Sequence, residues 1–163
     1  WSFTRLFIQA PAGRQRFNVL AALDAISHEL VTVTNDSYIN ALSVCELLRQ
    51  LRQRHPDTPI TLVLDNARYQ KCKVVWSLAM SLNIELLYLP PYSPNLNLIE
   101  RLWKFVRKKC LYSTYYPNFE LFKQAISDCL AHTHDTYKDE LDSLLTLKFQ
   151  TFNDIDKVKF VTV

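Results

Sequence analysis

Apolar residues recur along the chain in two patterns, one typical of buried strands and one typical of helices. Residues 60–64 and 84–89 are short and mostly apolar, as expected for central strands of a sheet. Between residues 41 and 54 the apolar side chains follow one helix face, at Val44, Leu47, Leu48 and Leu51. Along the whole sequence these patterns predict strands over 16–24, 28–34, 60–64 and 84–89, and helices over 41–54, 71–82, 96–110 and 119–132.

The order of these elements predicts one mixed α/β domain over residues 1–163. The first two strands should form an antiparallel hairpin, because only residues 25–27 separate them. Residues 60–89 fit a βαβ unit, in which the two strands run parallel through a right-handed crossover. We expect residues 1–15 to form an entry segment, in which residues 5–9 form a short strand or an extended stretch and residues 11–13 form a turn. Residues 146–163 are expected to form a C-terminal tail.

The composition excludes several classes of site. Gly13 is the only glycine, so glycine-rich phosphate-binding loops are excluded. The four cysteines are widely spaced, which argues against a zinc site and a disulfide framework. The apolar runs fall well short of the ~20 residues of a membrane span, so no membrane is expected as a partner. A net charge of +3 is compatible with a polyanionic partner without indicating one.

Two carboxylates are expected at one edge of the sheet. Asp65 closes a strand, and Glu100 lies one turn into the helix that follows the proline-rich loop 90–94. Sites in open α/β sheets form beyond the carboxyl ends of parallel strands, where this loop also begins. The three prolines stiffen the loop and so fix the position of Glu100. Asp and Glu oxygens suit Mg²⁺ or Mn²⁺, and two such ions support displacement at a phosphoryl group.

The polar side of the predicted helix 96–110 carries Glu100 together with Lys104, Arg107 and Lys108. One acid beside several bases fits a site that binds metal and a neighbouring DNA phosphate. Each residue also has a simpler explanation. Asp65 fits a turn or cap residue, Glu100 and Lys104 an i,i+4 surface pair, and the bases ordinary surface charge. Other polar residues are expected to be structural or exposed, namely Asp24 at the hairpin turn, His132 and His134.

Two segments in this order resemble a known family. The first is Leu64-Asp65-Asn66-Ala67, and the second is the run LPPYSPNLNLIERLWK over residues 89–104, with 34 residues between the two acids. They resemble the insertion-sequence transposases of the mariner-type superfamily, which are DDE-type enzymes. Residues 16–23 and 144–152 are also similar to this family, so the resemblance spans nearly the whole chain.

The resemblance implies an RNase H-like fold with two Asp and one Glu that hold two Mg²⁺ or Mn²⁺ ions. It implies hydrolysis at a transposon end, followed by attack of the freed 3′-hydroxyl on target DNA, typically at TA. Asp65 would be the second acid and Glu100 the third. Lys104, Arg107 and Lys108 would contact double-stranded DNA, and the residues shaping the loop would be Asn66, Tyr92 and Asn97. Such enzymes act as homo-oligomers on paired DNA ends, here in the prokaryotic cytoplasm at the nucleoid.

The sequence departs from the family at the first acid. No Asp precedes Asp24, which matches the end of the family's second strand, and no N-terminal helix-turn-helix region is present. The chain begins at Trp1 and its only methionine is Met80, so we expect an upstream segment to carry the first strand. That strand should lie between the strands ending at Asp24 and Asp65. Without it, the isolated chain is expected to be inactive and poorly stable.

Two alternatives stay open at this stage. The chain could be a catalytically dead transposase remnant that acts only in DNA binding or oligomerisation. It could also be an RNase H-like nuclease that cleaves without strand transfer.

Overall fold

Four strands form two separate pairs in the computed structural model, which describes residues 15–91 and 96–148. The elements in chain order are β1 (Asn18–Leu23), β2 (Leu30–Asn35), α1 (Ala41–Arg54), β3 (Ile60–Leu64), the 3-10 turn η1 (Arg68–Gln70), α2 (Lys73–Ser81), β4 (Ile84–Tyr88), α3 (Leu98–Val106), the π turn η3 (Arg107–Leu111), α4 (Phe119–Ala131) and α5 (Lys138–Leu144).

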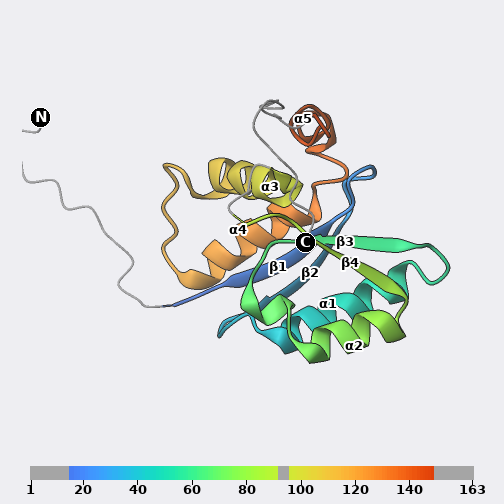
Figure 1. Cartoon of the computed structure of the whole chain (residues 1–163). Coiled ribbons are helices and arrows are strands. Elements are labelled where there is room, and N and C mark those ends of the chain that lie inside the picture. Colours follow the sequence, from blue (N-terminus) through green and yellow to red (C-terminus); the bar gives the residue numbers. More distant parts are fainter. Residues whose placement is uncertain (1–14, 92–95, 149–163) are drawn as a thin grey trace, which may run out of the picture.

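Helices cover both faces of the β1–β2 hairpin, whereas the described side chains of β3 and β4 join only the core on the α1 and α2 side (Figure 1). On one side, α1 and α2 pack on the strands through a core that includes Leu48 and Val75, both fully buried. On the other side, α3, α4 and α5 enclose a second core around Leu102 and Leu141. The hairpin β1–β2 contributes apolar side chains to both cores, which is why its sequence is apolar on both faces. The result is a three-layer α/β/α arrangement, as the mixed α/β prediction requires.

The β1–β2 hairpin confirms the predicted antiparallel pair, with Asn18 opposite Asn35 and Leu23 opposite Leu30. Asp24 begins its turn, because the side-chain Oδ1 accepts hydrogen bonds from the N–H groups of Ile26 and Ser27 at 2.8 and 2.7 Å. These backbone donors hold the pKa of Asp24 below its usual value. The predicted structural role of Asp24 is thereby confirmed.

The turn of the hairpin lies against α5, which comes late in the chain. His28 has a left-handed φ of 61° and is 5% exposed. Its Nδ1 lies 2.9 Å from Oδ1 of Asp142 on α5, although the pair lacks hydrogen-bond geometry. A buried imidazole of the hairpin turn therefore faces a carboxylate of α5.

Strands β3 and β4 confirm the predicted parallel pair, with Ile60 opposite Ile84 and Leu64 opposite Tyr88. Within the described ranges, β1 pairs only with β2, and β3 only with β4. One edge of β1 and one edge of β3 therefore have no described strand beside them. β2 and β4 each have an open edge as well, and the sequence predicts a further strand between β1 and β3.

The helices differ from the sequence predictions at three places. The predicted helix 96–110 is α-helical only to Val106 and then widens into the π turn η3, in which the N–H of Tyr112 donates to the carbonyl of Arg107 at 3.0 Å. The helix α5 was not predicted at all. The predicted helix 71–82 is shorter, because η1 precedes it. By contrast, α1 has the predicted bounds, and Asn118 caps α4 as predicted.

No helix among the described residues is long and apolar enough to cross a membrane. The predicted strand 5–9, the turn 11–13, Tyr92 and most of the tail 146–163 lie outside the described residues.

Candidate functional site

Asp65 lies directly after β3, at the carboxyl end of the parallel pair. Its side chain is exposed, and its Oδ1 accepts a hydrogen bond from the N–H of Ala67 at 3.2 Å. This local bond turns the chain away from the sheet and orients the carboxylate. No cation of the described part of the chain forms an ion pair with Asp65, so the carboxylate is available to a ligand.

The chain around Asp65 is tied to the end of β4. The N–H of Leu89 donates to the carbonyl of Leu64 at 2.9 Å, and the side-chain Nδ2 of Asn66 donates to the carbonyl of Leu89. The residues on either side of Asp65 thus hold both backbone groups of Leu89. Leu89 is followed by Pro90 and Pro91, which start the connection to α3. The segment that leads to Glu100 therefore leaves the same edge of the sheet as Asp65.

Tyr69, which was not predicted as a site residue, lies close enough to Asp65 to sense its charge. Burial raises the pKa of Tyr69, and the negative charge of Asp65 raises it further. Like any tyrosine, Tyr69 keeps its proton at neutral pH, and a protonated phenol is a hydrogen-bond donor. Sequence patterns could not identify Tyr69, because its position depends on the 3-10 turn η1.

Glu100 lies in the first turn of α3, where the sequence placed it. Asn97 begins the helix by accepting a hydrogen bond from the N–H of Ile99 at 3.3 Å, and the carbonyl of Asn97 accepts from the N–H of Glu100 at 3.2 Å. A carboxylate is favoured at this end of the helix by the helix dipole. The described residues include no ion pair of Glu100, so the surface pair with Lys104 is not formed.

Lys104, Arg107 and Lys108 are exposed. Lys104 belongs to the α-helical part of the segment, whereas Arg107 and Lys108 belong to the π turn η3. None of these side chains has a carboxylate partner among the residues that the structure describes. By contrast, the neighbouring Arg101 has a structural role, because its guanidinium donates a hydrogen bond to the carbonyl of Thr146 at 2.7 Å.

The carboxylates of Asp65 and Glu100 have the chemistry of a site for a hard divalent cation. Asp65 follows β3 and Glu100 lies in α3, and neither is neutralised by a described cation. Within residues 15–91 and 96–148, no group of three or more His, Cys, Asp and Glu side chains could hold a metal ion. The two carboxylates are therefore ligand types that suit Mg²⁺ or Mn²⁺, and the described residues complete no three-carboxylate site around them. Asn97 is placed at the start of α3, and Tyr92 lies outside the described residues.

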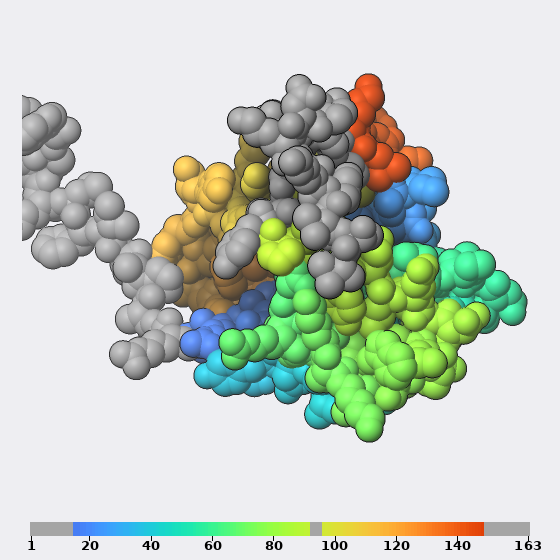
Figure 2. Space-filling view, viewed as in Figure 1, coloured from blue at the N-terminus to red at the C-terminus, as the bar shows by residue number. Residues whose placement is uncertain are grey.

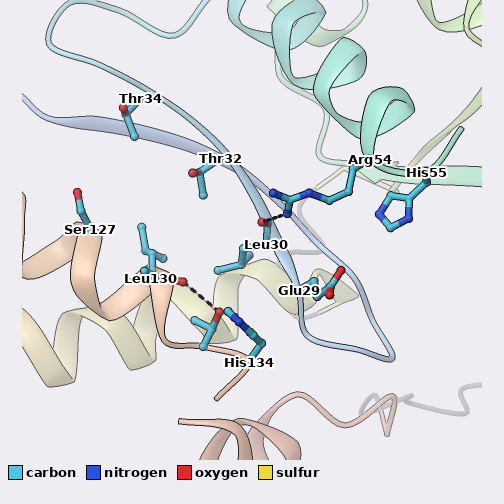
Figure 3. Close-up of a pocket in the computed structure, with 11 residues that line it drawn as sticks. Glu29, Leu30, Thr32, Thr34, Arg54, His55, Ser127, Leu130 and His134 are labelled. Carbon is cyan, nitrogen blue, oxygen red and sulfur yellow. Dashed lines mark hydrogen bonds between the residues drawn. The ribbon is translucent and has the colours of Figure 1, made fainter. Parts of the chain in front are cut away.

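A pocket of about 700 Å³ opens elsewhere, between β2, the end of α1 and the end of α4 (Figure 3). It is lined by Arg54, His55 and His134 among others, and includes neither Asp65 nor Glu100. Arg54 donates to the carbonyl of Leu30 at 2.9 Å and so covers part of the free edge of β2. His132 and His134 are both exposed, as predicted. This pocket is separate from the candidate site.

Comparison with solved structures defines the fold. A chain of the simian T-cell lymphotropic virus intasome in complex with PP2A regulatory subunit B56 gamma matches 75% of this chain with 14% identity and a TM-score of 0.55. The match spans 47% of that intasome chain. The catalytic core domain of BIV integrase matches 79% of this chain and 92% of its own, with 20% identity and a TM-score of 0.57. The fold is therefore that of an integrase catalytic core, which is RNase H-like.

Sequence comparison identifies the family of the chain. No curated protein matches it. The model of the DDE superfamily endonuclease family matches residues 4–123, which include Asp65, Glu100 and the basic residues that follow Glu100. Because this match covers most of the chain and agrees with the fold, the protein belongs to the DDE superfamily endonucleases.

Proposed function

We propose that this chain supplies catalytic residues of a DNA transposase of the mariner-type superfamily. The observation that carries the proposal is the fastening of Leu89 by Leu64 and Asn66, which brings the start of the path to Glu100 beside Asp65. The family match and the integrase-like fold support it independently. This arrangement would place two uncompensated carboxylates where a DNA phosphate can approach.

Asp65 and Glu100 would hold two Mg²⁺ or Mn²⁺ ions together with a third acid. Bound there, the ions would stabilise the negative charge that develops on the attacked phosphate and on the leaving oxygen. The protein would contribute a fixed carboxylate at Asp65, oriented by the N–H of Ala67, and a second at the first turn of α3. Tyr69 would stay a neutral phenol near Asp65, whose charge and the burial of the ring raise its pKa.

The proposed reaction has two steps. In the first, the oxygen of a water molecule attacks a phosphodiester at the transposon end, which breaks the P–O3′ bond and leaves a 3′-hydroxyl and a 5′-phosphate. In the second, this 3′-hydroxyl attacks a phosphodiester of the target, so that one P–O3′ bond forms while another breaks. Target cleavage at TA and pairing of two DNA ends by a homo-oligomer follow from the family resemblance and belong to the proposal.

The third acid would come from a strand between β1 and β3. Both strands present an edge without a described partner, and an unpaired edge accepts an added strand. An Asp on that strand would lie next to the carboxyl end of β3, beside Asp65. We therefore propose that the 163-residue chain alone does not cleave DNA and that a segment upstream of Trp1 restores cleavage.

Cleavage of DNA carrying the parent element's ends tests the proposal. We expect Mn²⁺-dependent cutting by a protein extended upstream of Trp1, and loss of cutting in that protein when Asp65→Asn or Glu100→Gln is introduced. Asp57→Asn, which alters an exposed acid in the loop before β3, is the matched control and should leave cutting unchanged. Cutting that survives both Asp65→Asn and Glu100→Gln would contradict the assignment of these acids.

The same reactions separate the two alternative functions. Within the described residues no group of three or more His, Cys, Asp and Glu side chains could hold a metal ion, which agrees with the remnant that only binds DNA or forms oligomers. That alternative predicts DNA binding without cleavage by every form of the protein. A nuclease without strand transfer would cleave, but would leave no product in which the transposon 3′ end is joined to target DNA.

A further inference from the structure

The part of the chain between Asp65 and Glu85 carries cations and no acid. Between Asp65 and Glu85 the sequence contains Arg68, Lys71 and Lys73 but no Asp or Glu, so these residues give the segment a charge of +3. All three side chains are exposed. This cationic segment follows Asp65 directly and was not part of the sequence-based site.

Local structure explains why the cations face outward. The 3-10 turn η1 closes through the N–H of Gln70, which donates to the carbonyl of Ala67 at 3.0 Å. Its two other residues point inward, since Gln70 is 5% exposed and Tyr69 packs against the core under α1 and α2. Because the turn is anchored by these two residues, Arg68 and Lys71 are held on the surface at fixed places.

Tyr88 fastens this segment to the edge of the sheet where Asp65 lies. The hydroxyl of Tyr88 donates to the carbonyl of Gln70 at 2.9 Å, and Nζ of Lys71 lies 5.2 Å from the centre of the Tyr88 ring. Tyr88 ends β4 and is paired with Leu64, the residue before Asp65. The ammonium group of Lys71 therefore lies over the ring of a residue whose strand partner is the neighbour of Asp65. The green segment that follows β3 lies on the visible face of the molecule in Figure 2.

Many cations elsewhere in the described chain are bound by the protein itself. Lys109 pairs with Glu140 at 2.7 Å, and Lys123 pairs with Asp36 at 3.3 Å and Glu120 at 3.2 Å. By contrast, no described carboxylate or carbonyl pairs with Arg68, Lys71 or Lys73. Three neighbouring positive charges repel one another, and a bound polyanion would relieve this repulsion.

We propose that Arg68, Lys71 and Lys73 form a second DNA-binding surface, which contacts backbone phosphates on the Asp65 side of the site. This inference rests on the proposed function, in which Lys104, Arg107 and Lys108 contact DNA on the Glu100 side. DNA would be held from two sides, with the reacting phosphate between the two sets of cations. Phosphate contacts of this kind position the duplex without reading its sequence.

The salt dependence of DNA binding tests the inference. The present chain would be titrated with a fluorescent random-sequence duplex, and its affinity followed by anisotropy as the NaCl concentration is raised. Each phosphate contact contributes roughly −0.9 to the slope of log K against log salt. Changing Arg68, Lys71 and Lys73 together to Gln should therefore make this slope shallower by about 2 to 3 and weaken binding at least about tenfold near 0.1 M salt.

Two further triple variants make the outcome interpretable. The first changes Arg16, Arg49 and Lys138 to Gln, which removes the same charge at exposed positions on other elements. The second changes Lys104, Arg107 and Lys108 to Gln. The inference is overturned, and the proposed function stands, if two results are found together. The Arg68–Lys71–Lys73 variant would bind DNA as tightly as the Arg16–Arg49–Lys138 variant, and the Lys104–Arg107–Lys108 variant would lose affinity.

Other outcomes are also decisive. If all three variants lose affinity equally, binding depends on net charge alone and both DNA surfaces are rejected. If the unsubstituted chain does not bind the duplex at low salt, the DNA-binding part of the proposed function fails together with the inference. The mean-residue ellipticity and the melting temperature of each variant should match the unsubstituted chain, because every changed side chain is exposed.

Discussion

Arg52 connects three segments that meet at the ends of helices and strands. Its guanidinium donates hydrogen bonds of 2.7 to 3.1 Å to five backbone carbonyls, those of His55, Pro56, Thr58, Leu82 and Asn83. These carbonyls belong to the end of α1, the loop before β3, and the turn between α2 and β4. The planar five-donor fork of arginine suits such convergence, whereas lysine presents a single ammonium.

We expect Arg52→Lys to lower the free energy of unfolding by about 1.5–3 kcal/mol, because hydrogen bonds to a charged group contribute on this scale and several carbonyls lose their donor. Urea denaturation measures the difference. Arg49→Lys on the same helix is the control and should change stability by less than about 0.5 kcal/mol, as an exposed substitution. Equal effects of the two substitutions would show that the carbonyl contacts of Arg52 add nothing.

At the residue scale, the sequence predicted the candidate acids but not their surroundings. Asp65 and Glu100 were found because a strand end and a helix start have recognisable patterns. The contact of Asn66 with Leu89 was not predictable, since it joins residues 23 positions apart through a side chain. The approach of Tyr69 to Asp65 depends on the 3-10 turn η1, for which the sequence carries no periodic signal. The combined role of Asp65 and Glu100 in metal binding stays a prediction.

At the element scale, the sequence predicted elements with long apolar patterns reliably, but it did not predict short or irregular elements. Helix α1 has four core positions at helical spacing and was predicted with its observed bounds. Helix α5 has only Leu141 buried within its bounds, so its pattern is indistinguishable from a loop. The π turn after Val106 changes the hydrogen-bond spacing without changing the residue types, and apolar periodicity does not detect it.

The end of α4 carries an ion pair whose charge depends on pH. Nδ1 of His132 lies 3.0 Å from Oδ2 of Asp135. This contact raises the pKa of His132 and lowers the pKa of Asp135 to about 2. The stabilisation linked to His132 is complete below its unfolded-state pKa of about 6.5 and is lost as pH rises through the raised folded-state value. The Asp135 contribution is present above its unfolded-state pKa of about 3.9 and is lost toward pH 2.

We therefore expect the stability difference between the unsubstituted chain and His132→Gln to be larger at pH 5.5 than at pH 9, because the pair is charged only at the lower pH. Denaturation midpoints in urea at both pH values measure it. Titration of the other histidines affects both proteins and cancels in the difference. We expect the change in the stability difference to be small, because both side chains of the pair are exposed. A stability difference that is the same at both pH values would rule out a contribution from the pair.

At the scale of the whole molecule, the open edges of β1 and β3 separate the fold into two strand pairs. The core on the α1 and α2 side, rather than a continuous sheet, joins the two pairs, because all four strands contribute side chains to it. The sequence predicted this open position from the family resemblance and not from local patterns, because an unfilled place in a sheet leaves no mark on the strands beside it. The predicted low stability of the isolated chain follows from the same feature and has not been tested.

Hydrogen exchange tests whether an added strand fills this position. In the present chain we expect the backbone amides of β1 and β3 that do not bond to β2 or β4 to exchange rapidly. In a protein extended upstream of Trp1, the same amides should be protected, since they would bond to the added strand. Amides in the centre of α1, which are bonded within the helix, should be unchanged and serve as the internal reference. Unchanged protection of β1 and β3 would contradict the placement of the added strand.

The two strand pairs also bear on the order in which the chain folds. The β1–β2 hairpin closes through the turn at Asp24, and β3 reaches β4 through a single helix, so both pairs form between segments close in sequence. Contacts between such segments have a low loop-closure cost and can form early. The approach of His28 to Asp142, by contrast, closes most of the chain into one loop. We infer that strand pairing precedes the docking of α5.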